Sequence, residues 1–372
     1  MKFNDLDLYN NHLNKKIIKD LKNTISENNF IFGKSVIKLE NTLSNLTGSK
    51  YAITLASGTD ALLLSLMSLN LKADDEIIIP AFSWLSILEV VLLLKLKPKF
   101  VDINKNSFNC DIKKIENTIN KKTRVIVSTS LFGRSADLEI LKNICNKNNI
   151  VHIEDAAQNF GSYIKNQNSC NIAHITCTSF FPSKNLGAFG DGGAIFTNNK
   201  IINNKIIKLR NHGQHRYNES KFIGVNSRIG SIQASILNSK LKDFKNKKKR
   251  QQTLYKKYCN FFDKNNITGF TRPRHNREFN DMNSQFSMIV KKRNLLIKYL
   301  KKYKINYKIY YSKPLYRQFS YKKKVYLENT EFVCKKIISL PFNDISISRF
   351  SSVLKKLQKI ISKDRGIFFE KK

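Results

Sequence analysis

The sequence predicts an α/β protein, with a mainly parallel sheet in a large domain and a smaller α+β domain after it. Three observations support this: the length, the alternation of short apolar runs with helical patterns, and a change of pattern near residue 245. The chain has 372 residues, which suits two domains better than one small core. Apolar residues make up 41% of it, so a sizeable core can be buried and global disorder is not expected.

Short apolar runs between residues 50 and 196 are typical of buried strands. The expected strands are residues 51–55, 76–80, 98–101, 124–128, 150–154 and 175–179. Helical patterns lie between several of them, as at residues 60–69 and 136–146. Strand, helix and strand at this spacing predict a mainly parallel sheet with helices on both faces. Ligands of such sheets bind at the carboxyl ends of the strands.

The pattern changes in the last third of the chain. Residues 229–262 are charged and helical in period, which predicts one long connecting helix. Apolar segments at residues 286–290, 307–311 and 332–340 then suggest a smaller α+β domain. We therefore expect a large domain of residues 1–245 and a small C-terminal domain of residues 246–372.

The formal net charge is +38, which raises the question of nucleic-acid binding. The excess lysine is scattered and accompanied by asparagine and isoleucine, whereas a binding face needs clustered charge. We therefore expect no nucleic-acid partner, although anionic substrates would be attracted to such a protein. A regulatory or nucleic-acid-binding protein that retains the fold stays as an alternative.

Cysteine usage and hydropathy indicate a cytoplasmic protein. The six cysteines form no CxxC pair and have no histidine at zinc-ligand spacing, so we expect reduced thiols and no metal. Residues 1–16 lack the apolar segment of a signal peptide. The most apolar stretch, residues 84–96, is too short to span a bilayer.

Ser57, Gly58 and Thr59 follow the first expected strand and open the helix after it. Small residues let the backbone approach an anion closely, and a helix N-terminus offers unpaired N–H groups and a positive dipole end. The Thr59 hydroxyl adds a donor. The segment therefore fits a phosphate, and it fits equally well an ordinary N-cap before a core helix.

Glu154 and Asp155 place two adjacent carboxylates at the end of an expected buried strand. A carboxylate at that point is costly unless it is paired. A protonated pyridine nitrogen is a suitable partner, and enzymes that use pyridoxal phosphate place an Asp beside it. The alternative is that Asp155 only caps a helix.

Lys184 lies in an apolar, glycine-rich loop after the strand at residues 175–179. Desolvation there lowers the pKa of a lysine and frees its amine for Schiff-base formation. An exposed loop lysine is the alternative, because lysine is mostly a surface residue. A phosphate cradle, an acid and a lysine that each follow a strand of one sheet are the parts that pyridoxal phosphate needs. We therefore predict Lys184 and Asp155 as catalytic residues.

At these residues the sequence resembles the DegT/DnrJ/StrS family of sugar aminotransferases, over nearly the whole chain. The matching motifs are residues 30–33, 154–158, 179–185, 190–193, 210–214, 224–228 and 340–341. The resemblance implies an aspartate-aminotransferase-like fold with a mainly parallel seven-stranded sheet. Residues 179–184 and 224–228 look closest to the branch that aminates C3 of UDP-2-acetamido-2-deoxy-ribo-hexuluronate for bacterial surface-polysaccharide (O-antigen) synthesis.

The resemblance also implies the residues that hold the cofactor. They are Gly58, Thr59, Trp84, Asp155, Gln158, Ser179, Lys184 and Asn226. Lys184 would carry the cofactor covalently, Asp155 would pair with its pyridine nitrogen and Gln158 would contact its ring hydroxyl. Trp84 would stack on the ring, although a core tryptophan is the alternative. The phosphate would be held by Gly58, Thr59 and Ser179, and Asn226 would reach the phosphate in the neighbouring subunit, which implies a homodimer with shared active sites.

The substrate contacts implied by the resemblance are Gly33, Arg228, Tyr310 and Tyr311. Arg228 would meet an anionic part of the substrate, although a surface ion pair is the alternative. Many relatives carry a histidine where this chain has Ser130, and serine also occurs in the hexuluronate branch. Relatives often have histidine at the position of Tyr310, so the substrate contact from this segment differs here.

The implied reaction is a transamination that uses L-glutamate and a nucleotide-linked keto sugar, here UDP-3-keto-N-acetylglucosaminuronate. One alternative is amination at C4 of a UDP- or dTDP-4-keto-6-deoxy sugar, since the sequence does not reveal the sugar pocket. A sugar dehydratase of the same fold would carry histidine in place of Lys184, so the lysine argues against it.

Overall fold

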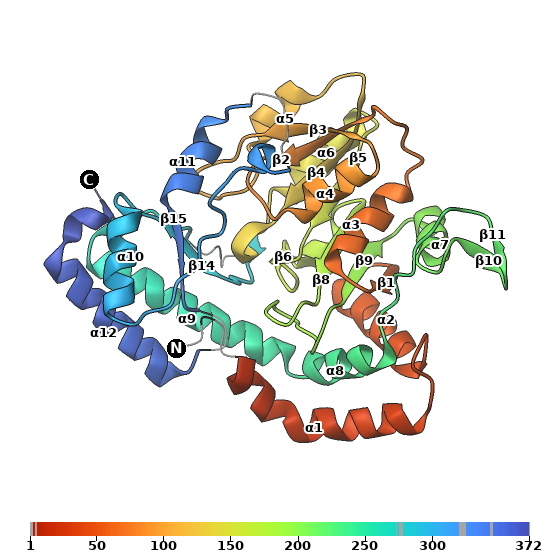
Figure 1. Ribbon diagram of the computed structural model, residues 1–372, viewed down its shortest axis with the longest axis horizontal. Helices are drawn as coiled ribbons and strands as arrows, with labels where there is room; N and C mark the ends of the chain where they lie inside the picture. The colour runs from red at the N-terminus through yellow and green to blue at the C-terminus, as the bar shows by residue number, and fades with distance from the viewer. Residues whose placement is uncertain are drawn as a thin grey trace.

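The computed structural model describes residue 3, residues 6–272, residue 274, and residues 278–319, 325–342 and 345–371. Its centre is a seven-stranded sheet in the order β1-β9-β8-β5-β4-β2-β3 (Figure 1). In that order the strands are β1 (Tyr51–Leu55), β9 (Gly193–Thr197), β8 (Ile175–Ser179), β5 (Val151–Asp155), β4 (Thr123–Thr129), β2 (Glu76–Pro80) and β3 (Lys97–Val101). Only β9 runs antiparallel to its neighbours in this sheet. The predicted mainly parallel sheet is therefore confirmed.

The six expected strands all form, each within one residue of its predicted bounds. The seventh, β9, was not among them. It returns directly from the loop after β8 and inserts between β8 and β1. Gly193 makes this insertion possible, because a Cβ there would lie 2.3 Å from the Ser57 carbonyl oxygen.

Helices cover both faces of the sheet, as the alternation of apolar residues along the strands requires. Ile53 and Leu55 of β1 pack in one cluster with α3 (Gly58–Met67), α4 (Ser86–Leu93) and α7 (Lys200–Leu209). Ala52, directly before Ile53, packs on the other face. That face carries α2 (Lys34–Thr47), α5 (Ile112–Thr118), α6 (Leu138–Lys147) and α8 (Ser231–Leu241).

The expected long helix over residues 229–262 is wrong, because the structure has two helices there. The first is α8, and the second is α9 (Phe244–Lys264). The physical reason is that their apolar faces are buried in different places. Ala234 and Leu237 of α8 pack beneath the large sheet, whereas Tyr258 and Phe262 of α9 belong to a second core. The N-terminal helix α1 (Leu6–Ser26) packs against α8 (Figure 1).

The second core is built only from residues between Leu254 and Phe368. It lies among α9, α10 (Arg293–Lys302), α12 (Ile347–Lys363) and the pair β14 (Phe286–Ile289) and β15 (Ile337–Leu340). Residues 332–340 form the end of α11 (Glu328–Lys336) and then β15, and residues 307–311 contribute a single bridge, from Lys308 to Ser339. This separate core supports our proposal of a domain boundary near residue 245.

Several short elements complete the fold. They are β6 (Tyr163–Ile164), β7 (Gln167–Asn168), β10 (Gln214–Arg216), β11 (Glu219–Ser220), β12 (Ile267–Thr268), β13 (Phe279–Asn280) and β16 (Phe369–Glu370), with the 3-10 turns η1 (Leu131–Gly133), η2 (Ser169–Asn171), η3 (Leu315–Arg317) and η4 (Arg365–Ile367). The six cysteines are buried and unpaired. Within the described part of the chain, no helix is both long and apolar enough to cross a bilayer.

Asp102, directly after β3, joins the large sheet to α11. Its side chain is buried, with 1% of its surface exposed. Oδ1 accepts hydrogen bonds from the Thr330 N–H (2.8 Å) and hydroxyl (2.7 Å), and Oδ2 accepts from the Lys114 ammonium (2.9 Å) and the Asn329 N–H (3.1 Å). Burial raises the pKa of Asp102, but the Lys114 and Thr330 hydrogen bonds outweigh it and hold the pKa below its usual value. The carboxylate thus caps α11 from the other side of the domain boundary.

We predict that Asp102→Asn lowers the free energy of unfolding by about 3 kcal/mol at neutral pH, because it breaks a buried charge pair and turns an N–H donor toward other donors. Because the folded-state pKa is depressed, the carboxylate contributes its stability above the unfolded-state pKa of about 4 and loses it as the pH falls below that value. Thermal unfolding of both proteins from pH 7 to pH 3 measures this. The control is Asp74→Asn, which removes an exposed ion pair with Lys97 and should change the stability little. Equal losses of stability in the two variants would contradict the role of Asp102 as a cap that joins the large sheet to α11.

Candidate active site

A cavity of about 330 Å³ opens at the carboxyl edge of the sheet. Its lining contains nine of the predicted site residues, which are Gly58, Thr59, Trp84, Asp155, Gln158, Ser179, Lys184, Tyr310 and Tyr311. They come from segments that follow β1, β2, β5 and β8, and from the chain before η3. The parallel strands bring these ends together, as the sequence predicts.

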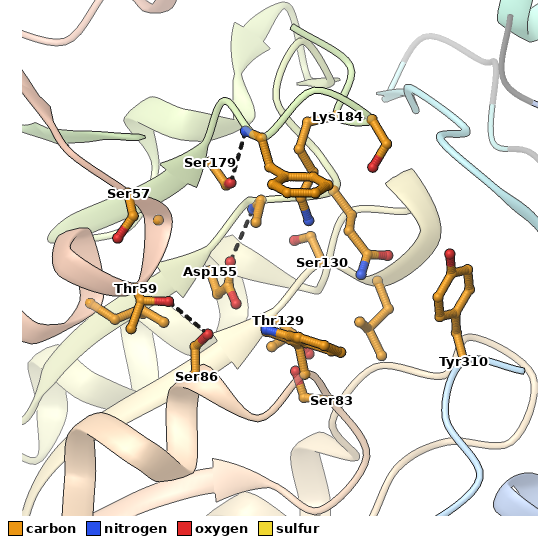
Figure 2. A pocket seen from close by; sticks show the side chains of 18 of the residues that line it. Ser57, Thr59, Ser83, Ser86, Thr129, Ser130, Asp155, Ser179, Lys184 and Tyr310 are labelled. Atoms are coloured by element: carbon orange, nitrogen blue, oxygen red, sulfur yellow. Dashed lines mark hydrogen bonds between the residues drawn. The ribbon is translucent and has the colours of Figure 1, made fainter. Parts of the chain in front are cut away.

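Ser57 to Thr59 form the first turn of α3 at one end of the cavity (Figure 2). The Ser57 hydroxyl accepts a hydrogen bond from the Asp60 N–H at 3.0 Å, so the capping interpretation is correct and the cradle coexists with it. The Thr59 and Ser86 hydroxyls lie 2.9 Å apart. Gly58 sits so close to β8 that a Cβ would lie 2.7 Å from Ser179 Cβ. The turn therefore presents backbone N–H groups and hydroxyls to an anion at short range.

Asp155 ends β5 and lines the same cavity. One carboxylate oxygen accepts a hydrogen bond from the Ala157 N–H at 3.0 Å. The chain then continues through turns to β6, so Asp155 does not cap a helix. Burial raises the pKa of Asp155, and the Ala157 N–H and the charge of Lys184 oppose this rise. A cation placed in the cavity would be stabilised by this carboxylate.

Lys184 is partly buried in the loop between β8 and β9, and its side chain lines the cavity that Asp155 also lines (Figure 2). Burial lowers the pKa of Lys184, while the charge of Asp155 opposes that shift. A larger fraction of the amine is therefore neutral than in an exposed lysine, and the neutral amine is the nucleophilic form. The interpretation of Lys184 as an ordinary surface lysine is not supported.

An aromatic and amide wall borders the cavity. Trp84 is 54% exposed, which excludes the core-tryptophan alternative, and its ring lies 5.9 Å from that of Tyr311. Gln158 is held from both ends of its amide. Its Nε2 donates to the Tyr311 hydroxyl at 3.1 Å, and its Oε1 accepts from the Phe132 N–H at 2.7 Å. A flat ring could lie against Trp84 with Gln158 at its edge.

A fully buried carboxyl lies behind this wall. Ser130, which lines the cavity, donates its hydroxyl to Glu154 Oε1 at 2.6 Å. Burial raises the pKa of Glu154 to about 7, although hydrogen bonds from Ser130 and Asn159 oppose the shift. Glu154 is therefore partly protonated near neutral pH, which limits the negative charge next to Asp155.

Three predicted residues do not line the cavity. Gly33 caps α2, and its N–H donates to the Ser231 hydroxyl at 3.3 Å. Asn226 is exposed in the loop before α8. Arg228 donates to Asn211 Oδ1 at 2.7 Å, and its Nε is buried without a partner in the described structure.

Sequence reasoning missed several polar residues of the lining, which include Ser83, Ser86, Thr129, Ser130 and Gln285. Thr129 ends β4 and Ser130 follows it, so their place at the end of a strand was a usable signal. Thr129 Oγ1 and Gln285 Oε1 are both buried and have no hydrogen-bond partner within the described residues. Both oxygens can therefore accept a hydrogen bond from a molecule in the cavity.

The residues present fit pyridoxal phosphate. The cavity offers an anion cradle that a Cβ at Gly58 would obstruct, a carboxylate whose pKa is raised by burial, and a lysine whose pKa is lowered by burial. These match a phosphate, a pyridine nitrogen and an aldehyde respectively.

Comparison with known proteins agrees with this geometry. The sequence profile of the DegT/DnrJ/EryC1/StrS aminotransferase family matches residues 11–358. The chain is 41% identical, over 244 residues, to the UDP-2-acetamido-2-deoxy-3-oxo-D-glucuronate aminotransferase of Pseudomonas aeruginosa, covering 66% of this chain and 68% of that protein. It is 30% identical, over 353 residues, to the UDP-N-acetyl-3-dehydro-alpha-D-glucosamine 3-aminotransferase of Acidithiobacillus ferrooxidans, covering 92% and 94%.

Solved structures share the fold. A DegT DnrJ EryC1 StrS aminotransferase from Brucella abortus superimposes with a TM-score of 0.90 at 27% identity, covering 97% of this chain and 99% of that one. NtdA from Bacillus subtilis, with bound cofactor PMP, gives a TM-score of 0.89 at 26% identity, covering 97% and 85%. Together with the profile match over most of its length, these likenesses show that the chain belongs to the DegT/DnrJ/EryC1/StrS aminotransferase family.

Proposed function

We propose that this aminotransferase moves the amino group of L-glutamate to a nucleotide-linked keto sugar, with pyridoxal phosphate as its cofactor. The observation that carries the proposal is the arrangement of Lys184, Asp155 and the Ser57–Thr59 turn around one cavity. The substrate is UDP-3-keto-N-acetylglucosaminuronate, supported by the 41% identity to an enzyme named for that 3-oxo sugar. The product serves surface-polysaccharide synthesis in the cytoplasm.

Six residues of the cavity lining bind the cofactor in this proposal. Gly58, Thr59 and Ser179 bind the phosphate, because the helix N-terminus and the hydroxyls meet there. Asp155 pairs with the pyridine nitrogen. Gln158 contacts the ring hydroxyl, and its position is set by the Phe132 N–H and the Tyr311 hydroxyl. Trp84 stacks on the ring.

The cofactor, when bound, supplies an electron sink that stabilises negative charge at the donor Cα. Asp155 would keep the pyridine nitrogen protonated, since its carboxylate is desolvated and Lys184 is the cation that lowers its pKa. Lys184 holds the cofactor through its Nζ. The amine of Lys184 would also be the base that accepts the Cα proton of glutamate and the acid that gives a proton back. With the keto sugar, Lys184 would move the proton in the opposite direction.

The substrate lies at the end of the cavity that Tyr310 borders, away from the Ser57–Thr59 turn (Figure 2). The Tyr311 ring contacts that of Tyr310. Tyr310 provides a hydroxyl where relatives often carry histidine. Asn226, Arg228 and Gly33 act in a homodimer with shared active sites. Asn226 reaches the phosphate in the partner subunit, Arg228 meets an anionic part of the substrate, and Gly33 lies beside it. Their position away from the cavity of their own chain supports this arrangement.

We expect the purified protein, supplied with glutamate and UDP-3-keto-N-acetylglucosaminuronate, to release 2-oxoglutarate and the 3-amino sugar, identified by mass spectrometry. UDP- and dTDP-4-keto-6-deoxy sugars run in parallel test amination at C4. Lys184→Ala should lose the cofactor absorbance band and turnover, because no other amine lines the cavity as described. Lys200→Ala, at an exposed helix end, should retain both. A Lys184→Ala protein that still transaminates would refute the proposal.

Asp155→Asn should bind the cofactor but lower kcat by at least about 100-fold, since an amide does not hold the pyridine nitrogen protonated. In the cofactor-free protein the same substitution should lower the pKa of Lys184, because the charge of Asp155 raises it. Labelling of Lys184 by an amine-reactive reagent, followed by peptide mass spectrometry across pH, measures this shift. A shift of the labelling midpoint to higher pH would contradict the charge pairing.

Shared active sites predict complementation between two impaired variants. Lys184→Ala and Asn226→Ala homodimers should both be weak. In a mixed dimer, one site combines the intact Lys184 of one subunit with the intact Asn226 of the other. Random reassociation should therefore restore about a quarter of wild-type activity, since half of the dimers are mixed and each has one intact site. If Asn226 acts only within its own subunit, mixing restores nothing.

A further inference from the structure

Gln285 lies in the active-site cavity but has no proposed role in binding the cofactor. Its side chain lines the active-site cavity. Its Oε1 is buried and accepts no hydrogen bond within the described residues. A buried amide oxygen without a donor is unfavourable, so the free protein retains this atom at a cost that a bound molecule can remove.

The backbone fixes the position of Gln285 independently of its side chain. The N–H groups of Ser284 (2.9 Å) and Gln285 (3.4 Å) donate to the Phe132 carbonyl oxygen, and the Asn283 N–H donates to the Gly133 oxygen at 3.0 Å. Gly133 allows this approach, because a Cβ there would lie 2.3 Å from the Ser284 nitrogen. A change of the Gln285 side chain therefore leaves the chain path in place.

Gln285 comes from a different part of the chain than the phosphate cradle and Asp155. The phosphate cradle and Asp155 lie at the ends of β1, β8 and β5, on the side of the cavity opposite Tyr310 (Figure 2). Gln285 directly precedes β14, in the second half of the chain that also supplies Tyr310 and Tyr311. Its backbone N–H donates to the carbonyl oxygen of Phe132, in the turn that also contains Leu131, another residue of the cavity lining.

We propose that Gln285 is a substrate-specificity residue whose Oε1 accepts a hydrogen bond from the sugar of the nucleotide-linked substrate. An oxygen acceptor requires a donor, which on such a sugar is the N–H of an acetamido group or a hydroxyl. The neutral amide recognises this donor without adding charge to a site that already contains Lys184 and Asp155. The inference rests on the proposed function, because it takes the keto sugar as the second substrate.

The two half-reactions separate this role from a structural one. Glutamate meets the cofactor without the sugar, so Gln285→Leu should leave the single-turnover rate of the glutamate half-reaction and the cofactor absorbance unchanged. The sugar half-reaction should lose about 10-fold or more in kcat/KM, as expected when one neutral hydrogen bond to a substrate is removed. Ser284→Ala is the matched control, since its Oγ is likewise buried and unpartnered but does not line the cavity, and it should affect neither half-reaction.

Substrate variants identify the donor. With a UDP-3-keto sugar that has hydrogen in place of the 2-acetamido group, wild type and Gln285→Leu should become equal if the acetamido N–H is the donor. If their ratio persists, a sugar hydroxyl is the donor. Unchanged sugar kinetics in Gln285→Leu, or an equal loss in both half-reactions, would overturn the inference. If the wild-type protein aminates no nucleotide-linked keto sugar at all, the proposed function is wrong. That result differs from failure of the Gln285 inference alone, in which the wild type is active and Gln285→Leu is equally active.

Discussion

Parallel hydrogen bonding of β5 between β4 and β8 places Asp155, Thr129 and Ser179 at one edge of the sheet. The register pairs Thr129 with Asp155 directly. The residues that line the cavity from the large domain depend on this alignment, because Asp155 and Ser179 each end a strand and Gly58, Trp84, Gln158 and Lys184 lie shortly after one. The insertion of β9 between β8 and β1 adds to it, since it brings the Ser57–Thr59 turn within reach of Ser179.

The electrostatics of the cavity follow from burial. Desolvation lowers the pKa of Lys184 and raises that of Asp155. The charge of each residue opposes the pKa shift of the other. Glu154 sits on the same strand but lies in the core, where burial raises its pKa to about 7 although the hydrogen bond from the Ser130 hydroxyl opposes this rise. Of the two adjacent carboxylates, Asp155 lines the cavity and Glu154 is fully buried, which agrees with the choice of Asp155 from the sequence.

The turn at Leu131–Gly133 couples the cofactor side of the cavity to the C-terminal part of the chain. Its Phe132 N–H holds Gln158, and the carbonyl oxygen of the same residue holds the segment before β14. Gln158 in turn donates to Tyr311. Gln158, the proposed contact of the cofactor ring, and Tyr311, a proposed substrate contact, are therefore joined by a short series of hydrogen bonds to this turn. Asp102 makes a second connection, through its cap on α11.

The sequence by itself determined the parallel strands and the residues at their ends, because apolar runs bounded by turn residues are local features that hydrogen bonding within the sheet only aligns. It also identified Lys184, Asp155 and the Ser57–Thr59 turn by their place after strands. Only the tertiary structure decided the insertion of β9, the break between α8 and α9, and the presence of Gln285 in the cavity. Each of these depends on contacts between residues far apart in the chain, and no local periodicity encodes such contacts.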